Sequence, residues 1–184
     1  MADPLREEAV ALRDGRRLSI RPVRAGDEEA LLENVNLVAA EHAYLLMDRV
    51  PVDLDAERAW IASFDGERSA LFLAVDGDAI VGQADCRGGE FPKIAHSGVI
   101  GIAVRDGWRE AGLGRILMER VLEWMRSRGF LTARLSVFAS NVRARRLYES
   151  LGFEVEGTRR KHVRIHGELV DEVLMALWLR EPDG

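Results

Sequence analysis

The sequence of 184 residues predicts a single-domain α+β fold with a mixed, mostly antiparallel sheet and flanking helices. Short apolar runs typical of strands alternate with segments in which apolar residues recur at helical spacing. Two pairs of strand-like runs are joined by turns of hairpin type. Together these signals give the order β-αα-ββ-β-α-β-α-ββ, which favours an antiparallel α+β arrangement. Residues 1–16 are polar and expected to be peripheral, and the domain is expected to span residues 17–180.

The first third of the chain predicts one strand and two helices. Leu18–Arg21 has the pattern of a strand, and Asp27 is placed to cap a helix that runs through Glu41. Asp53 opens a second predicted helix, which ends near Phe64. The apolar and aromatic segment between the two helices, residues 42–48, is predicted to be a connector.

The middle of the chain predicts a hairpin, a strand and a long helix. Asp76-Gly77-Asp78 separates the apolar runs 70–75 and 79–84, which is a strong hairpin signal. Residues 99–104 form another strand-like run. The helix that follows ends near Gly129 and is expected to turn one apolar face inward. That face consists of Leu113, Ile116, Leu117, Val121 and Met125.

The last third predicts a strand, a short helix and a long terminal hairpin. Residues 133–138 are strand-like, and Asn141 is a good N-cap for the helix after them. Residues 153–165 and 168–179 then form two strands that turn at His166-Gly167.

Composition excludes several classes of function. The net charge is −5 and there is no basic tail, so nucleic-acid binding is disfavoured. No apolar run approaches the roughly 18 residues of a membrane span, and the charged N-terminus lacks the apolar core of a secretion signal. The single cysteine, Cys86, fits a reducing compartment, so a cytoplasmic location is expected. The four histidines show no metal-ligand spacing, so no metal is expected.

The stretch Arg109-Glu110-Ala111-Gly112-Leu113-Gly114 lies between an apolar strand and an amphipathic helix. The first backbone N–H groups of a helix lack intrahelical partners, and the helix dipole adds positive potential there. Gly112 and Gly114 let an anion approach the backbone closely, while Arg109 and Arg115 add charge. We interpret this turn as a pyrophosphate site; the alternative is a tight connection only.

A second motif, Asn141-Val142-Arg143-Ala144-Arg145-Arg146-Leu147-Tyr148-Glu149-Ser150-Leu151-Gly152-Phe153, follows the next strand. With the first motif, it resembles the GCN5-related N-acetyltransferase (GNAT) family. That family has an Arg/Gln-x-x-Gly-x-Gly/Ala loop, followed later by Asn-x-x-Ala-x-x-Leu-Tyr-x-x-x-Gly-Phe. The early run from Ile20 to Asp27 is also similar to the family's first strand and turn.

The resemblance implies a sheet splayed in the middle around acetyl-CoA, and an acyltransferase that acetylates a primary amine. A small-molecule acceptor is slightly favoured; a protein N-terminus or lysine is the alternative, as is a non-catalytic acyl-CoA-binding regulatory module. The resemblance further implies that Tyr148 protonates the departing thiolate. A homodimer through the terminal hairpin is common in such proteins, and the alternative is that this hairpin completes one copy's sheet. The residues expected to bind the cofactor are Ile102, Ala103, Val104, Arg109, Glu110, Ala111, Gly112, Leu113, Gly114, Arg115, Asn141 and Arg145.

The general base is where the chain departs from the family pattern. Many similar proteins have His-x-x-Glu-Leu-Gly-Ile on the central strand, whereas this chain has Val99 in place of the glutamate. An alkylammonium still has to lose a proton, and valine cannot accept one. The candidates near the expected cleft are Glu41, His42, Asp85, Glu90 and His96, of which His96 and Glu41 are favoured.

Overall fold

The computed structural model describes residues 4–180. The strands are β1 (Glu8–Ala11), β2 (Arg17–Pro22), β3 (Ser69–Asp76), β4 (Ala79–Gly88), β5 (Ser97–Val104), β6 (Thr132–Phe138), β7 (Glu154–Ile165) and β8 (Glu168–Trp178). The helices are α1 (Glu28–Ala39), α2 (Leu54–Ala62), α3 (Leu113–Ser127) and α4 (Val142–Ser150), with a 3₁₀ turn, η1 (Pro92–Ile94).

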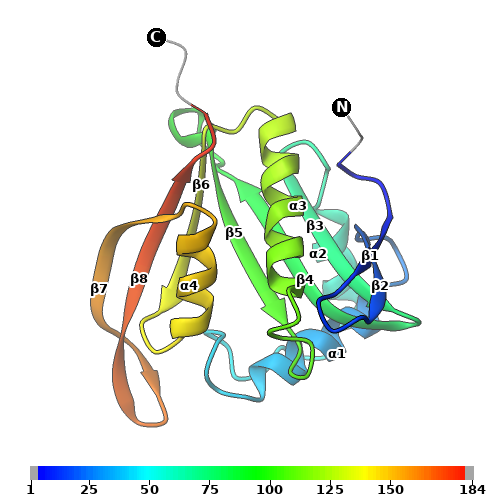
Figure 1. The fold of residues 1–184 in the computed structure, drawn as a ribbon, viewed down its shortest axis with the longest axis horizontal. Coiled ribbons are helices and arrows are strands. Elements are labelled where there is room, and N and C mark those ends of the chain that lie inside the picture. Colours follow the sequence, from blue (N-terminus) through cyan, green and yellow to red (C-terminus); the bar gives the residue numbers. More distant parts are fainter. Residues whose placement is uncertain (1–3, 181–184) are drawn as a thin grey trace.

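All described strands join one eight-stranded sheet in the order β1-β2-β3-β4-β5-β6-β8-β7. The β5–β6 pair is parallel and the other pairs are antiparallel. The predicted α+β class with a mostly antiparallel sheet is therefore confirmed. Figure 1 shows α3 and α4 in front of this sheet and α1 and α2 behind it.

Two predictions about the first part of the chain need correction. The polar N-terminal segment contains a strand that the sequence analysis did not predict, because β1 pairs with β2 at the edge of the sheet. Asp27 does precede α1, but its carboxylate makes no capping bond to the helix. It instead accepts two hydrogen bonds of 2.7 Å from the buried guanidinium of Arg21. A buried guanidinium without a partner costs more than an open helix end, so this pairing prevails.

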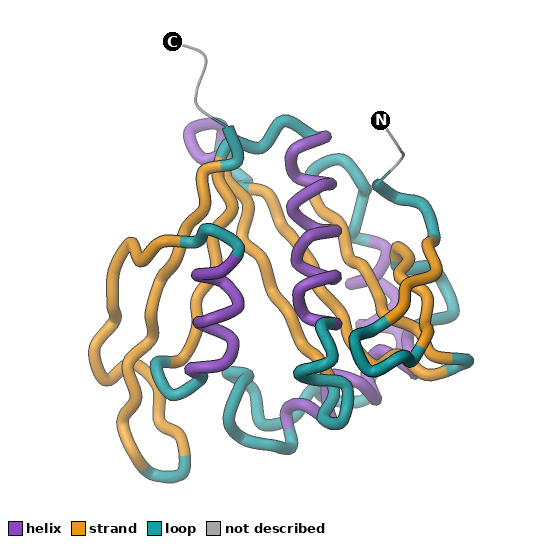
Figure 2. Tube along the Cα trace, in the orientation of Figure 1, coloured by secondary structure: helices purple, strands orange, loops and turns teal. Residues whose placement is uncertain are grey.

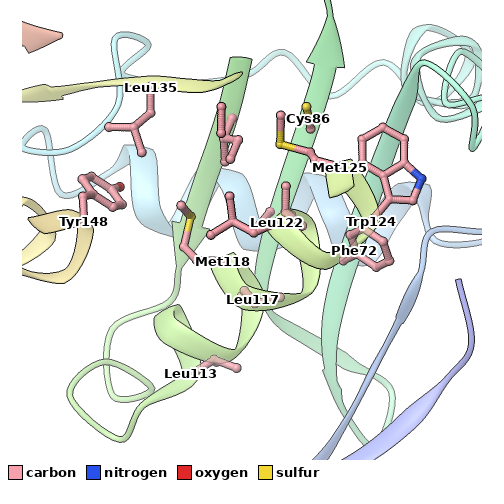
Figure 3. Close-up of a cluster of buried hydrophobic side chains, with 14 of the residues drawn as sticks. Phe72, Cys86, Leu113, Leu117, Met118, Leu122, Trp124, Met125, Leu135 and Tyr148 are labelled. Atoms are coloured by element: carbon pink, nitrogen blue, oxygen red, sulfur yellow. The ribbon is translucent and has the colours of Figure 1, made fainter. Parts of the chain in front are cut away.

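The core has two layers because β3 is apolar on both faces. Phe72 and Ala74 pack with α3, while the alternate residues Leu71 and Leu73 pack with Leu31 of α1. The larger layer lies beneath α3, where Leu117, Met118 and Leu122 point toward the sheet and Tyr148 approaches from α4 (Figure 3). Of the predicted inward face of this helix, every residue except the partly buried Ile116 is fully buried.

The sheet divides between β5 and β6. Their pairing covers only Ser97–Val99 against Thr132–Arg134, after which β5 stays with β4 and β6 continues along β8. Figure 2 shows the two strands diverging below this pairing, with α3 and α4 on either side of the opening. The divergence leaves one edge of β5 without a neighbouring strand beyond Val99.

Candidate acetyl-CoA and acceptor cleft

A cleft of about 760 Å³ occupies the place where β5 and β6 part. Its walls are Val99–Val104 of β5, Ser136–Phe138 of β6, the N-terminus of α3 and the inner face of α4. The connector between α1 and α2 contributes Tyr44–Met47. In Figure 1 this connector, in blue to cyan, passes below the opening between α3 and α4. Segments far apart in sequence thus meet around one cavity.

The N-terminus of α3 is open toward the cleft. Gly112 has φ +93°, in the left-handed region that favours glycine, and supplies no side-chain cap. Within residues 4–180, the N–H groups of Leu113, Gly114 and Arg115 donate to no protein acceptor, whereas Ile116 bonds the Gly112 carbonyl at 3.2 Å. Unpaired N–H groups and the positive end of the helix dipole are features that suit an anion.

Basic side chains of α3 and α4 lie around this helix end. Arg115 lines the cleft, and Arg143 and Arg146 of α4 line it from the opposite side. Arg145 lies outside the cleft lining, where its guanidinium donates to Glu149 at 3.0 Å. Ala111 and Leu113 are buried in the core, so only their backbone groups remain available to a ligand.

Arg13 is a cleft residue that the sequence analysis missed. Its N–H donates to the Ala111 carbonyl at 3.0 Å, which fixes the β1–β2 turn against the glycine-containing loop. A Cβ at Gly112 would lie 3.4 Å from Arg13 Nε, so the guanidinium stem lies directly beside this loop. No local motif marks Arg13, because its position depends on the pairing of β1 with β2.

The Arg109 side chain does not enter the cleft as a free cation. Its Nη1 donates to Glu41 at 2.6 Å, its Nε donates to the Val104 carbonyl at 2.9 Å, and it stacks on Tyr44 at 4.7 Å. Hydrogen bonding to Glu41 raises the pKa of Arg109, so it stays charged. Arg109 therefore ties the α1–α2 connector to the end of β5.

The open edge of β5 brings backbone groups to the cleft. Ile102, Ala103 and Val104 all line it and lie beyond the last pair with β6. Alternate N–H and C=O groups on an unpaired strand edge can bond an extended ligand as an added strand would. This arrangement suits a flexible chain with amide groups.

α4 contributes a closed N-terminus and a buried phenol. Asn141 caps the helix as predicted, its side-chain oxygen accepting from the N–H of Ala144 at 3.1 Å. Tyr148 lines the cleft while being 5% exposed, and burial raises its pKa to about 12. Burial is the one cause of this shift, and no residue among 4–180 hydrogen-bonds the hydroxyl, so it can donate to a ligand.

The candidate bases fall in different places. Glu41 is paired with Arg109, and His96 is exposed at the N-terminal end of β5, outside the cleft lining. His42 is exposed and contacts Asp48 at 3.0 Å, and Glu90 is exposed. Asp85 lies on β4 beside the cleft residue Gly101. None of these five candidates is part of the cleft lining itself; Asp85 lies next to it, on the strand beside Gly101.

Glu172 is a second cleft residue without a sequence signal. It is 2% exposed on β8, and Arg159 donates to its carboxylate at 2.8 Å. His162 Nε2 lies 3.4 Å from Glu172 Oε2. The register between β7 and β8 shifts between Arg159 and Val163, the part of β7 that contains His162. In the part of the chain that the structure describes, no group of three or more metal-ligating side chains is arranged around an ion site.

Comparison with known proteins accounts for this architecture. The model of the acetyltransferase (GNAT) family matches residues 37–153, which include both glycine-containing motifs. The chain belongs to this family. A structure of yncA from Salmonella typhimurium with its cofactor acetyl-CoA has a TM-score of 0.82. At 24% identity it covers 91% of this chain and 96% of that one, and shows the shared GNAT fold.

Two curated relatives are similar over part of their length. The L-amino acid N-acetyltransferase AaaT of Escherichia coli K12 is 34% identical over 110 residues, which are 58% of this chain and 65% of that protein. The ribosomal protein bS18-alanine N-acetyltransferase of Salmonella typhimurium is 41% identical over 76 residues, or 41% and 51% of the two chains. This GNAT chain therefore matches between half and two thirds of these relatives. No helix among residues 4–180 is long and apolar enough to cross a membrane.

Proposed function

We propose that this GNAT protein transfers the acetyl group of acetyl-CoA to a primary amine. The observation that carries the proposal is the convergence of three elements on one cleft. These are the open N-terminus of α3, the unpaired edge of β5 and the hydroxyl of Tyr148. The first suits a pyrophosphate, the second an extended pantetheine chain, and the third a leaving thiolate.

The donor is held mainly by backbone groups. The N–H groups of residues 112–115 bind the pyrophosphate, and Arg13, Arg115, Arg143 and Arg146 supply positive charge around it. The amides of pantetheine bond the edge of β5 from Ile102 to Val104. Arg109 and Glu41 act indirectly, by fixing the connector that closes the acceptor side. Asn141 serves the helix cap and borders the donor.

The reaction needs one proton removed and one supplied. A neutral amine nitrogen attacks the thioester carbonyl carbon, the C–S bond breaks, and CoA leaves as a thiolate. Tyr148 donates its phenolic proton to that sulfur, because its hydroxyl is free and faces the cleft. Burial keeps the phenol protonated at neutral pH, since its pKa is raised to about 12.

The acceptor is proposed to be a small amine. Leu45, Leu46, Met47 and Val99 line the cleft, so an amine with an apolar substituent would find complementary surface. One relative is named for acting on L-amino acids and the other for a ribosomal-protein alanine, so a protein N-terminus is the second candidate. A binding module without turnover is the third.

A thiol-release assay with acetyl-CoA and a panel of amines tests this proposal. The panel contains amino acids, polyamines, aminoglycosides and N-terminal peptides. Tyr148→Phe is expected to lower kcat about 10- to 100-fold while leaving acetyl-CoA affinity within about threefold. The matched control is Tyr44→Phe, which removes the other tyrosine hydroxyl of the chain and keeps the ring under Arg109. CoA binding without turnover of any amine would favour the binding module instead.

Location and assembly are proposed separately. A cytoplasmic enzyme suits the buried, free thiol of Cys86. For the homodimer, β7 is the outer strand and exposes Arg159, Arg160, Lys161 and Arg164. Cationic, irregular edge strands resist pairing with another chain, which favours a dimer through another face or a monomer. Light scattering after size-exclusion chromatography distinguishes these states.

A further inference from the structure

Asp85 lies on the acceptor side of the sheet, next to the cleft. On β4 it is opposite Leu71 of β3 and Gly101 of β5. Leu71 packs in the cluster with α1, and residues opposite each other share a face, so Asp85 faces the α1 side. Gly101 lines the cleft and Asp85 is its partner on β4, so the carboxylate lies one strand away from the cavity, close enough for a water molecule to connect the two.

Gly101 makes the space that the Asp85 carboxylate occupies. A Cβ at position 101 would lie 2.7 Å from Asp85 Oδ1, so an alanine there would force the carboxylate to move. The φ of Gly101 is not positive, so its backbone does not require glycine. Glycine therefore serves here to let the carboxylate lie over β5, at the wall of the cleft.

Asp85 is half-buried and lacks the arginine partner that the buried carboxylates Asp27 and Glu172 have. Asp27 and Glu172 each accept from an arginine guanidinium. Within residues 4–180, no other residue donates a hydrogen bond to the Asp85 side chain, which is bonded only by its own backbone N–H. A half-buried carboxylate without a cationic hydrogen-bond partner, placed beside a cleft, points to function.

The charged surroundings of Asp85 are sparse. Arg87 on the same strand attracts it, but that guanidinium donates to Ser63 at 3.0 Å and stacks on Phe64 at 4.1 Å. α1 presents the neutral amide of Asn34, which donates to Gln83 at 3.1 Å. The neighbouring residues of β3 and β5 are uncharged, and the thiol of Cys86 lies on the other face. Burial raises the pKa of Asp85 to about 6, against the lowering effect of Arg87.

We propose that Asp85 is the general base that deprotonates the acceptor ammonium, through one water molecule in the cleft. The proposal rests on the acetyl transfer proposed above and assigns its missing proton acceptor. A carboxylate whose pKa lies slightly below neutral pH is ionised at that pH and still accepts a proton readily, which suits a general base. Glu41 and Glu172 are less suited, because each is already bound to an arginine.

The protons balance over one cycle. The ammonium gives one proton to Asp85 by way of the water, and the resulting amine forms the C–N bond. The C–S bond then breaks, Tyr148 gives its proton to the CoA sulfur, and the second proton of the attacking nitrogen passes through water to the Tyr148 phenolate. Asp85 returns its proton to solvent, so the products are the amide, CoA thiol and one free proton.

The test is the pH dependence of kcat/KM for Asp85→Asn against wild type, with an amine of pKa near 10.4. Wild type is expected to rise through a limb near pH 6 and then level off. Asp85→Asn is expected to lose about 100-fold at pH 7.5 and to rise about tenfold per pH unit, because only the free amine then reacts. The matched control is Asp78→Asn, which removes an exposed carboxylate from the β3–β4 turn and should leave the profile unchanged.

A rescue variant separates proton transfer from structure. Val99 is 59% exposed in the cleft and lies on the same face, diagonally about 7–8 Å from Asp85. Val99→Glu in the Asp85→Asn background is expected to recover at least tenfold of the lost kcat/KM and to restore a levelled profile. A uniform loss at every pH that this glutamate does not recover would give Asp85 a structural role and overturn the proposal.

The remaining outcomes separate this inference from the proposed function. Turnover by wild type with an unchanged profile in Asp85→Asn overturns the role of Asp85 and leaves acetyl transfer standing. No turnover by wild type with any amine overturns both. If Asp85→Asn does not fold, Gly101→Ala tests the same point, because its Cβ displaces the carboxylate. A limb near pH 6 that persists in Gly101→Ala at wild-type height would then overturn the proposal.

Discussion

The helices α3 and α4 follow β5 and β6, the two strands between which the sheet divides. Both helices begin at the cleft, but their first turns differ. α4 is closed by Asn141, whose side chain accepts from the Ala144 N–H at 3.1 Å. α3 is preceded by Gly112 with φ +93° and has no side-chain cap. The same strand-turn-helix unit thus satisfies its N–H groups internally in one case and leaves them for a ligand in the other.

This difference teaches how to distinguish a structural helix end from a binding one. A capping side chain stabilises a helix by about 1 kcal/mol, and its absence leaves N–H groups that need another partner. At α3 the uncapped end is also surrounded by Arg13 and Arg115. The N-terminus of α3 therefore suits an anionic ligand, whereas at α4 the N–H of Ala144 already has an acceptor.

The largest expected effect comes from placing a charge at the open end. Gly112→Asp is expected to weaken acetyl-CoA binding more than 100-fold, because its carboxylate caps the N–H groups and repels the pyrophosphate. Isothermal titration calorimetry measures the change.

The matched control is Gly112→Asn, which has the same shape, also tolerates a left-handed backbone and carries no charge. It is expected to weaken binding about tenfold at most. Equal losses for the asparagine and aspartate variants would show that filled space, rather than charge at the helix end, causes the effect.

At the capped N-terminus of α4, a substitution is expected to change the free energy of unfolding more than ligand binding. Asn141→Ala is expected to lower the free energy of unfolding by about 1 kcal/mol, because the α4 N–H of Ala144 loses its acceptor. Acetyl-CoA binding should change less than threefold. Urea unfolding followed by circular dichroism gives the first quantity and calorimetry the second. Asn141→Ser keeps a capping oxygen and should retain most of the free energy of unfolding. If Asn141→Ala weakened acetyl-CoA binding strongly and left the free energy of unfolding unchanged, Asn141 would be chiefly a ligand residue.

The smallest expected effect concerns the charge around α3. Arg13→Ala is expected to weaken acetyl-CoA binding about threefold at low salt and less at high salt, because a partly solvated charge is screened. Binding measured at two salt concentrations tests this, with Arg145→Ala as control since that side chain is outside the cleft. An equal loss for both variants would contradict a local role for Arg13.

The strands, helices and turns near each motif could be predicted because their causes are local. Asn141 caps α4 through a residue three positions away, and the hairpins turn at Gly77 and Gly167, both with positive φ. Tyr148 and the glycine-containing loop reach the cleft for a similar reason, because each belongs to a strand-loop-helix unit that begins on one side of the split in the sheet. Asp27 shows the limit, because its predicted cap was displaced by a bond to Arg21 on another element.

By itself, then, the sequence determined the α+β class, the positions of most elements and the two motifs of the donor site, since these depend on residues close together in the chain. Only the tertiary structure decided that Arg13 borders the helix end, that Arg109 is bound to Glu41, and that Asp85 lies over Gly101. Each of these contacts depends on strand register or on packing between distant segments. Such contacts form only when the whole sheet is assembled, and no short pattern of residues encodes them.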